Sequence, residues 1–324
     1  MAVRAYLFDA QGLDREVELD AATLDSVGGD RLLWVDAAGV DEDTLRRLAE
    51  LFGLQRESLR VLREPIGRPR LDTFGDYFQL ALMALVEDGE GEGSARAIEL
   101  DVVVGAEHLL TVHPEELPFL DELREHISRD SDVGRLDAPA FLAVILDWHV
   151  TSYFRIVEEL EKEVDRLDAA GLQADRPDDL LDALVRVRRR IGRVRRAIAP
   201  HRELYAALSR PDFEVVARSD SAAAFRALQD RMERAIESVE HARESLIGSF
   251  DLLMTRTAQR TNEIMKLLTL VSVVLLPAVV IAGVMGMNFK VAFFDEPAFF
   301  WVVIGFMILL AAGTLVAARV RRWI

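Results

Sequence analysis

The stretch LLTLVSVVLLPAVVIAGVMGMNF, residues 267–289, decides the fold because it holds no charged residue over a membrane-spanning length. At about 1.5 Å per residue, a helix of this length crosses a hydrocarbon layer roughly 30 Å thick. Residues 297–318 form a second uncharged stretch that is again long enough to span. The alternative, a pair of buried core helices, would normally keep a polar stripe. We therefore predict two transmembrane helices.

The charges around these stretches predict their orientation. Basic residues flank the outer ends of the pair, namely Lys266, Arg319, Arg321 and Arg322. By the positive-inside rule, both termini lie in the cytoplasm and the protein is a multi-pass protein of the cell (inner or plasma) membrane. The first ten residues, MAVRAYLFDA, lack the apolar core of a signal peptide. The connecting loop is then outside, where Asp295 and Glu296 are placed to attract cations.

The charge of the chain divides in the same way. The 324 residues carry a net charge of −16, from 39 basic and 55 acidic residues. Residues 1–260 hold 34 of the basic and 52 of the acidic groups, a net charge of −18, which leaves +2 for the last 64 residues. There is no cysteine, which excludes disulfide scaffolds, thiolate zinc sites, iron–sulfur centres and cysteine enzymes. At 51% hydrophobic residues the chain is too apolar to be a disordered acidic protein.

The first 260 residues predict an α+β fold. Strand-like patterns occur within the first 137 residues, with a helical pattern among them at residues 41–52; the strands are expected at residues 2–8, 31–35, 77–86, 97–104 and 108–112. From residue 138 the pattern is helical, with breaks at 171–177 and 200–211. No proline occurs between Pro211 and Pro277, so we expect one helix of about 100 Å that enters the first span. Such a helix needs neighbouring subunits or the preceding helical hairpin to cover its apolar stripe.

These patterns divide the chain into six predicted segments. A cytoplasmic α/β domain is followed by a helical hairpin with a long stalk helix, a first span, an outer loop, a second span and a basic tail. Their predicted bounds are residues 1–137, 138–265, 266–288, 289–297, 298–318 and 319–324, respectively.

The end of the first span carries a family resemblance. Gly286-Met287-Asn288 at this position resembles the signature of the CorA family of divalent cation (magnesium) transporters. The similarity extends through QRTNEIMKLLTL (residues 259–270), IAGVMGMNF (residues 281–289) and the terminal RRWI, and more weakly through the N-terminal domain. The resemblance implies a homopentamer whose first spans line a pore, whose second spans surround them and whose long helices form a cytoplasmic funnel. It implies no cofactor, with Mg²⁺ as the transported ion.

The resemblance also assigns pore residues. Those that match the family's pore positions are Asn288, Gly283, Thr269, Leu268, Met265 and Asn262. Counting at helical spacing adds Leu276, Val279 and Ser272 to the same face. Val279 stands where many relatives have threonine, which removes one ring of hydroxyl groups. For Thr269 and Ser272 the alternative is hydrogen bonding to their own helix.

The chemistry of these residues suits a hydrated magnesium ion. Mg²⁺ releases its bound water reluctantly, so the pore mouth should hold the hydrated ion. Five neutral Asn288 carbonyls could do this without binding the ion as tightly as five carboxylates would. Gly286 would allow the backbone to turn and approach closely, while Met287 is expected to pack, since thioether sulfur suits soft metals. Leu268, Leu276 and Met265 would form an apolar constriction that closes by dewetting.

The resemblance further implies regulation, because cytoplasmic Mg²⁺ in the family bridges acidic residues between subunits and closes the pore. Five soluble domains would carry a charge of about −90, a repulsion that divalent cations relieve. Where relatives carry an interfacial aspartate, this chain has Ala227. Asp230, Glu161 and Asp88 are the candidate substitutes, and the alternative for each is a solvated surface carboxylate.

Three other patterns point away from further functions. The arginine-rich residues 186–196 suggest nucleic acid, but acidic residues 158–168 on the preceding helix offer them partners, so no nucleic-acid binding is expected. His108 and His113 would point to opposite faces of a strand, a poor geometry for a metal site. No phosphate loop, HExxH or Ser-His-Asp spacing appears, so we do not expect an enzyme.

We therefore predict a channel for Mg²⁺, with Co²⁺ and Ni²⁺ as further ions, which conducts into the cytoplasm. A divalent ion gains about 4.6 kcal/mol per 100 mV of membrane potential. The alternative within transport is a zinc transporter of the ZntB type; the intact Met287 and the absence of a Gly-Gly loop after Asn288 favour magnesium. A membrane-anchored acidic sensor or scaffold is the alternative outside transport, against which Pro277 and Asn288 argue.

Overall fold

The structure is a computed structural model that describes residues 2–9, 14–88, 94–127, 137–173, 177–213, 221–287 and 297–320. The chain divides into two compact units, residues 1–249 and 250–324, which we call the first and the second unit. Helix α9 (Ala222–Met285) runs through the boundary between them.

The first unit is built on a seven-stranded sheet with the order β2-β1-β3-β7-β6-β5-β4. Every neighbouring pair is antiparallel except β3 and β7, which are parallel. The strands are β1 (Ala2–Asp9), β2 (Arg15–Val17), β3 (Arg31–Ala38), β4 (Arg70–Thr73), β5 (Phe78–Asp88), β6 (Ser94–Val104) and β7 (His108–His113). The mixed sheet and the helices after it confirm the predicted fold class.

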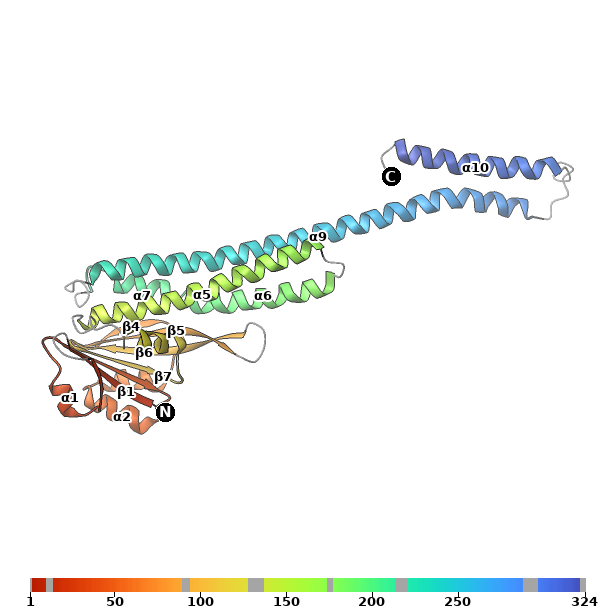
Figure 1. Cartoon of the computed structure of the whole chain (residues 1–324). Helices are drawn as coiled ribbons and strands as arrows, with labels where there is room; N and C mark the ends of the chain where they lie inside the picture. The colour runs from red at the N-terminus through yellow and green to blue at the C-terminus, as the bar shows by residue number, and fades with distance from the viewer. Residues whose placement is uncertain are drawn as a thin grey trace. The chain divides into compact units, whose positions relative to one another are not determined.

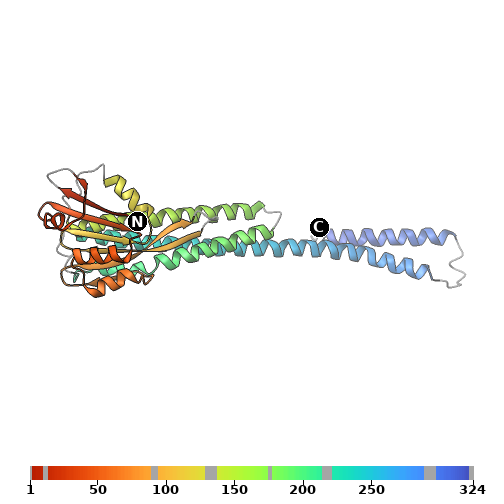
Figure 2. The ribbon, with the colours of Figure 1, turned by 90° about the horizontal axis from the view of Figure 1, so that it is seen from below.

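Helices cover both faces of this sheet (Figures 1 and 2). On one face, α2 (Glu42–Leu51) and α3 (Arg56–Arg63) pack on side chains such as Leu33 and Val35. Because side chains alternate along a strand, Trp34 points to the other face, where its ring meets Phe141 edge-on at 5.4 Å. The short helix α1 (Ala21–Asp25) precedes β3.

The second face carries the remaining helices of this unit, namely α4 (Pro118–Ile127), α5 (Ala138–Gln173), α6 (Pro177–Ile198) and α7 (His201–Leu208). Helix α9 is tied to three of them by ion pairs: Arg195 of α6 with Glu240, Arg202 of α7 with Glu233 at 2.9 Å, and Asp147 of α5 with Arg231. Of the two partners expected for the long helix, neighbouring subunits or the preceding hairpin, the hairpin helices α5 and α6 contact it within one chain.

The sequence predicted five of the strands and the helix over residues 41–52, with ends shifted by up to three residues. It missed β2 and β4, which have only three and four residues. It also missed α1, α3, α4 and α7, and the break predicted at residues 200–211 is wrong because α7 lies within it. The break predicted to begin at Gly171 is wrong at its start, because α5 continues to Gln173. Residues 89–93, between β5 and β6, lie outside the described residues.

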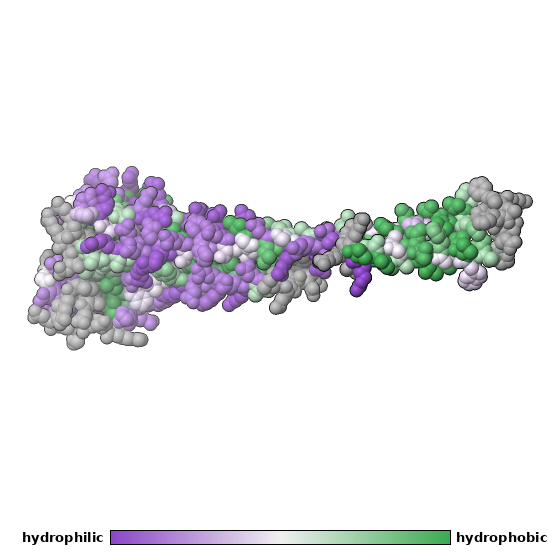
Figure 3. Space-filling model, turned by 90° about the horizontal axis from the view of Figure 1, so that it is seen from above, coloured by the Kyte–Doolittle hydropathy of each residue, from purple (hydrophilic) through white to green (hydrophobic). Residues whose placement is uncertain are grey.

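The second unit contains the C-terminal part of α9 and helix α10 (Pro297–Val320). Helix α9 continues through Pro277. Hydrophobic residues gather on these helices, whereas hydrophilic residues predominate on the first unit (Figure 3). Both helices are long and apolar enough to cross a membrane, and none of their most apolar window is buried. A third such helix, residues 138–170 of α5, is a core helix of the first unit because 56% of its window is buried.

Candidate functional site

One face of α9 carries a row of exposed residues that ends just before Gly286. The positions repeat at alternating steps of three and four residues, which keeps them on one side of a helix. They are Asn262, Met265, Thr269, Ser272, Leu276, Val279 and Gly283, and all are exposed. We call this set the α9 row. Leu268 lies beside it and is also exposed.

The opposite face of α9 is half-buried within the second unit. Its less exposed residues are Leu270, Val274, Pro277, Ala278, Ile281 and Met285. Helix α10 runs beside this part of α9, as two perpendicular views show (Figures 1 and 2). Its own less exposed residues recur at helical spacing: Phe299, Val303, Met307, Leu310, Thr314 and Ala318. The two helices thus turn these faces toward each other, and the α9 row lies on the side of α9 that α10 does not cover.

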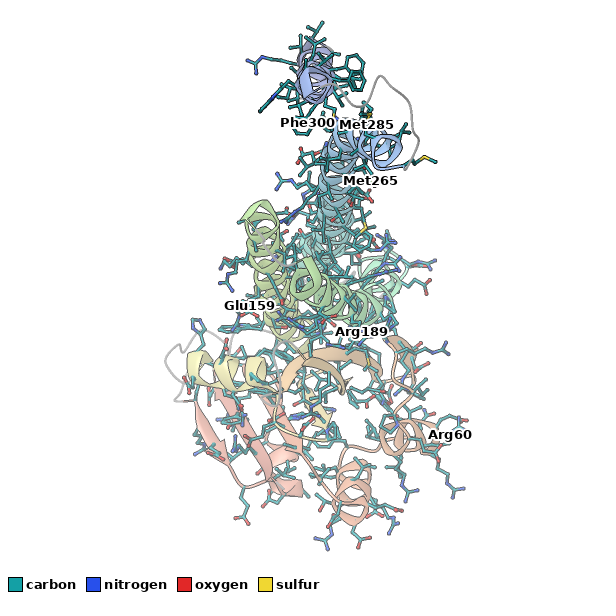
Figure 4. The ribbon with its side chains drawn as sticks, turned by 90° about the vertical axis from the view of Figure 1, so that its right-hand side faces the viewer. Arg60, Glu159, Arg189, Met265, Met285 and Phe300 are labelled. Carbon is teal, nitrogen blue, oxygen red and sulfur yellow. The ribbon has the colours of Figure 1, made fainter. Side chains whose placement is uncertain are left out.

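The α9 row carries three polar side chains, those of Asn262, Thr269 and Ser272, beside the apolar Met265, Leu276 and Val279. The Thr269 hydroxyl donates to the Met265 carbonyl at 2.7 Å, and the Ser272 hydroxyl donates to the Leu268 carbonyl at 2.8 Å. Hydrogen bonding to the same helix, the alternative considered for both residues, is therefore present. Each hydroxyl oxygen keeps its lone pairs for water or a cation, since only its proton is used. Met265, labelled in Figure 4, lies on the part of α9 that belongs to the second unit.

The described part of the chain stops inside the predicted pore mouth. The Gly286 N–H donates to the Ala282 carbonyl at 2.9 Å, and the Met287 N–H donates to the Val284 carbonyl at 3.2 Å. Gly286 does not adopt a positive φ, and an added Cβ would make ordinary contact with Ala282 O at 3.4 Å. Within one subunit, nothing in the described residues requires this glycine. Asn288, Asp295 and Glu296 lie outside the described residues.

Comparison with known proteins tests the resemblance. A family model described as "CorA-like Mg2+ transporter protein" matches residues 29–320, about nine-tenths of the chain. The chain belongs to this CorA-like family. It is 24% identical to the cobalt/magnesium transport protein CorA of Thermotoga maritima, over 90% of this chain and 83% of the relative. It is 27% identical to the putative metal ion transporter YfjQ of Bacillus subtilis, over 87% of each.

Solved structures share the fold of this CorA-like chain. The complete structure of the CorA magnesium transporter from Methanocaldococcus jannaschii has a TM-score of 0.82 at 22% identity and covers 100% of both chains. The cytoplasmic domain of ZntB from Vibrio parahaemolyticus has a TM-score of 0.65 at 12% identity, over 80% of this chain and 100% of that one. The likeness therefore extends over the whole chain for CorA and over a cytoplasmic domain for ZntB.

The candidate regulatory carboxylates of this CorA-like chain lie on three different elements. Asp230 is exposed on α9, and Glu161 is half-buried on α5. Asp88 is the last residue of β5, and its side chain lies outside the described residues. Within the described residues, no group of three or more His, Asp or Glu side chains could hold a metal ion.

The arginine-rich part of α6 pairs with α5, as the sequence predicted. Arg190 is buried and lies 2.9 Å from Glu163 and 3.2 Å from Glu159. Figure 4 shows Glu159 and Arg189 on these adjacent helices. Together, Glu159 and Glu163 neutralise the buried guanidinium.

The two strand histidines do not meet, as predicted. His113 Nε2 is 2.9 Å from Asp36 Oδ1, whereas the ring of His108 lies against Phe52. Burial lowers the pKa of His113, but the hydrogen bond and charge of Asp36 outweigh it and raise the pKa above its usual value. Asp36 also accepts from the Thr111 hydroxyl at 2.6 Å. These contacts hold β3 to β7.

A second buried polar group escaped the sequence analysis. His149 and His201 are fully buried between the sheet and the helices, and both contact the backbone of Met83. The Met83 N–H donates to His201 Nε2 at 3.1 Å, so this ring is neutral. His149 Nδ1 lies 3.0 Å from the hydroxyl of Tyr205. Burial lowers the pKa of His149 to about 4. A lone histidine in a helical pattern gives no signal of such a network.

Proposed function

We propose that this CorA-like chain is one subunit of a homopentameric channel that admits divalent cations, Mg²⁺ above all and Co²⁺ or Ni²⁺ as further ions. Ions enter the cytoplasm down the electrochemical gradient, and α9 lines the pore. The observation that carries the proposal is the α9 row, an exposed face that α10 leaves uncovered. The protein would then span the cell membrane twice, with both termini on the cytoplasmic side.

The polar members of the α9 row support an aqueous path. In a single subunit, Asn262 at its start, Thr269 and Ser272 would face hydrocarbon or a neighbour. Polar side chains in membrane helices usually face the bundle interior or a water-filled cavity. Five subunits that turn this face toward one axis satisfy that requirement, with α10 on the lipid side. The apolar Leu276, Met265 and Leu268 would then narrow the path and gate it by dewetting.

The selective step is assigned to the pore mouth. Asn288 offers neutral carbonyl oxygens that can hold a hydrated Mg²⁺ without trapping it. Gly283 and Gly286 present no side chain to a neighbouring subunit, while Met287 packs beside the opening. Asp295 and Glu296 raise the local cation concentration outside. The driving force is the membrane potential, worth about 4.6 kcal/mol per 100 mV for a divalent ion.

Ion uptake into proteoliposomes under an inside-negative potential tests this proposal. The wild-type protein should admit Mg²⁺ in preference to Zn²⁺, and Asn288→Ala should lose uptake or selectivity. Thr314→Ala is the matched control, because it removes a polar side chain from α10 instead of the proposed pore mouth. The channel proposal fails if neither ion enters or if Asn288→Ala conducts with unchanged selectivity. Preference for Zn²⁺ would make the chain a ZntB-like transporter.

We further propose that cytoplasmic Mg²⁺ closes the pore by bridging acidic side chains between subunits. The charge of −18 on residues 1–260 supports this, because divalent cations relieve the repulsion among five such domains. Asp230, Glu161 and Asp88 are the candidate ligands. Millimolar Mg²⁺ should protect the intact protein from protease, and Asp230→Asn should weaken that protection more than Glu237→Gln on the same helix. Equal protection with and without Mg²⁺ would contradict regulation while leaving transport intact.

A further inference from the structure

Two buried carboxylates share one guanidinium on the α3 side of the sheet. Glu99 and Asp101 stand two residues apart on β6, so both point to the same face. They are only 6% and 4% exposed. Arg70 of β4 places Nη2 at 2.9 Å from Asp101 Oδ1 and 3.6 Å from Glu99 Oε1. If both carboxylates are ionised, the trio carries a net charge of −1 out of contact with water.

The neighbours of this trio leave the pairing incomplete. Asp101 Oδ1 also accepts from the Gln79 amide at 3.2 Å, and the Gln79 carbonyl accepts from the Ser58 hydroxyl at 2.6 Å. Glu99 Oε2 accepts from the Gly67 N–H at 2.6 Å. Within the described residues, however, Glu99 Oε1 has no hydrogen-bond partner, and neither have Nε and Nη1 of Arg70. A buried oxygen of an ionised carboxylate without a partner is costly.

Other charges do little to restore neutrality. Asp72 Oδ2 lies 3.5 Å from Arg70 Nε, and its side chain is 45% exposed. The charged groups recorded around the trio within the described residues are thus Arg70, Asp72, Glu99 and Asp101, and α3 contributes only the neutral Ser58. This set holds three carboxylates and one cation. When Glu99 and Asp101 are both ionised, the single guanidinium of Arg70 therefore cannot neutralise both charges.

A proton is the ligand that completes this arrangement. One proton on the carboxylate pair cancels the excess charge and turns one acid into a hydrogen-bond donor. Burial raises the pKa of Asp101 to about 7; the Arg70 charge opposes this, while the Glu99 charge adds to it.

We propose that Glu99 and Asp101 form a buried proton-binding site, and that release of its proton to water loosens the β4 edge of the sheet together with residues 64–69. This edge is the weak side of the site, because β4 is four residues long and pairs with β5 alone. Arg70 and Gly67 tie it to the two acids. After deprotonation, opening of this edge lets water reach the excess charge.

Hydrogen–deuterium exchange of the full chain in detergent tests the site. Exchange of peptides covering residues 64–73 is measured at pH 6 and pH 8, corrected for intrinsic rates and compared with a peptide from β3. For a group with a pKa of about 7 when closed and 3.8 when open, the opening constant rises about tenfold over this interval. Asp101→Asn should abolish the rise. Asp72→Asn is the matched control, since it removes the exposed carboxylate beside Arg70. This variant should keep the tenfold rise in the opening constant.

If Asp101→Asn does not fold, the same exchange measurement on Glu99→Gln tests the proposal. Loss of the neighbouring negative charge lowers the remaining pKa, so the rise between pH 6 and pH 8 should shrink. The proposal is overturned if the wild-type edge shows the same protection at both pH values. It is also overturned if the folded Asp101→Asn or Glu99→Gln variants keep the full tenfold rise.

Discussion

The same apolar residue types occupy opposite environments in the two units. In the first unit, Leu80, Leu82 and Leu100 have no exposed surface. In the second unit, Leu276 and Leu309 are 65% and 71% exposed. The first unit therefore buries its hydrophobic residues within one chain, whereas the second must bury them in lipid or against other copies. The difference explains why a single chain buries the core of the first unit completely but leaves the α9 row of the second unit uncovered.

The largest expected effect is removal of a ring from the core of the first unit. Phe141 is fully buried against Phe8 and Trp34, so Phe141→Ala should lower the free energy of unfolding by about 3–5 kcal/mol. Denaturant unfolding of the protein in detergent, followed by circular dichroism, measures this loss. The matched variant Phe306→Ala removes a ring that is 53% exposed on α10 and should cost less than about 1 kcal/mol. Equal losses would contradict the distinction between the units.

Acid should destabilise the first unit through His149. Its folded pKa of about 4 lies below the ordinary 6.5, so the neutral ring stabilises the fold above pH 6.5, and this stability is lost as pH falls toward 4. The shift corresponds to about 3 kcal/mol. In unfolding titrations His149→Gln should show a shallower acid dependence than wild type. His126→Gln, a change at an exposed ring, should keep the wild-type slope.

A smaller effect is expected at the ion pairs between α5 and α6. Arg190→Met leaves Glu159 and Glu163 without their partner and should cost about 1–2 kcal/mol, because both carboxylates stay partly hydrated. Arg189→Met changes the neighbouring exposed arginine and should shift stability by less than about 0.5 kcal/mol. Thermal unfolding of the two variants provides the comparison, and similar melting temperatures would argue against the pairing.

The smallest effect on stability is expected on the α9 row. Thr269→Val removes a hydroxyl that bonds only to its own helix, so stability should change by less than about 0.5 kcal/mol. Uptake of Mg²⁺ should nevertheless fall about fivefold, because the conduction path loses the Thr269 hydroxyl of every subunit. This fall corresponds to a rise of roughly 1 kcal/mol in the activation barrier. Thr314→Ala on α10 should leave both quantities unchanged. Unaltered uptake by Thr269→Val would separate this residue from the conduction path.

The sequence predicted those features that depend on long uninterrupted patterns. The absence of proline before Pro277 indicated the continuous helix α9, and the acidic face of α5 indicated the partners of Arg190. It could not predict β2 and β4, whose pairing is set by neighbouring strands instead of their own three or four residues. The parallel pairing of β3 with β7 joins residues 75 positions apart in the sequence, such as Leu33 and His108, and has no local signal.

The sequence also could not predict the partners of the buried polar residues. The alternation in β6 puts Glu99 and Asp101 on the same side as Val103, a core position, but this side was not recognisable before α3 was known to cover it. His149 likewise gave no sign that it would meet Met83 and Tyr205, because that network joins three elements. Helical spacing placed the α9 row on one face of the helix, but only the position of α10 showed which face stays uncovered in the second unit.

The most direct test of the central claim uses the absence of cysteine in this chain. Single cysteines placed along α9 in the reconstituted protein would be exposed to a charged, membrane-impermeant thiol reagent. Positions on the α9 row, such as Ser272, Leu276 and Val279, should react because the row faces water. Val274, Ala278 and Ile281 should remain unmodified because they face α10. Reaction on the α10-facing side, or none along the row in protein that conducts Mg²⁺, would contradict the assignment of this face to the pore.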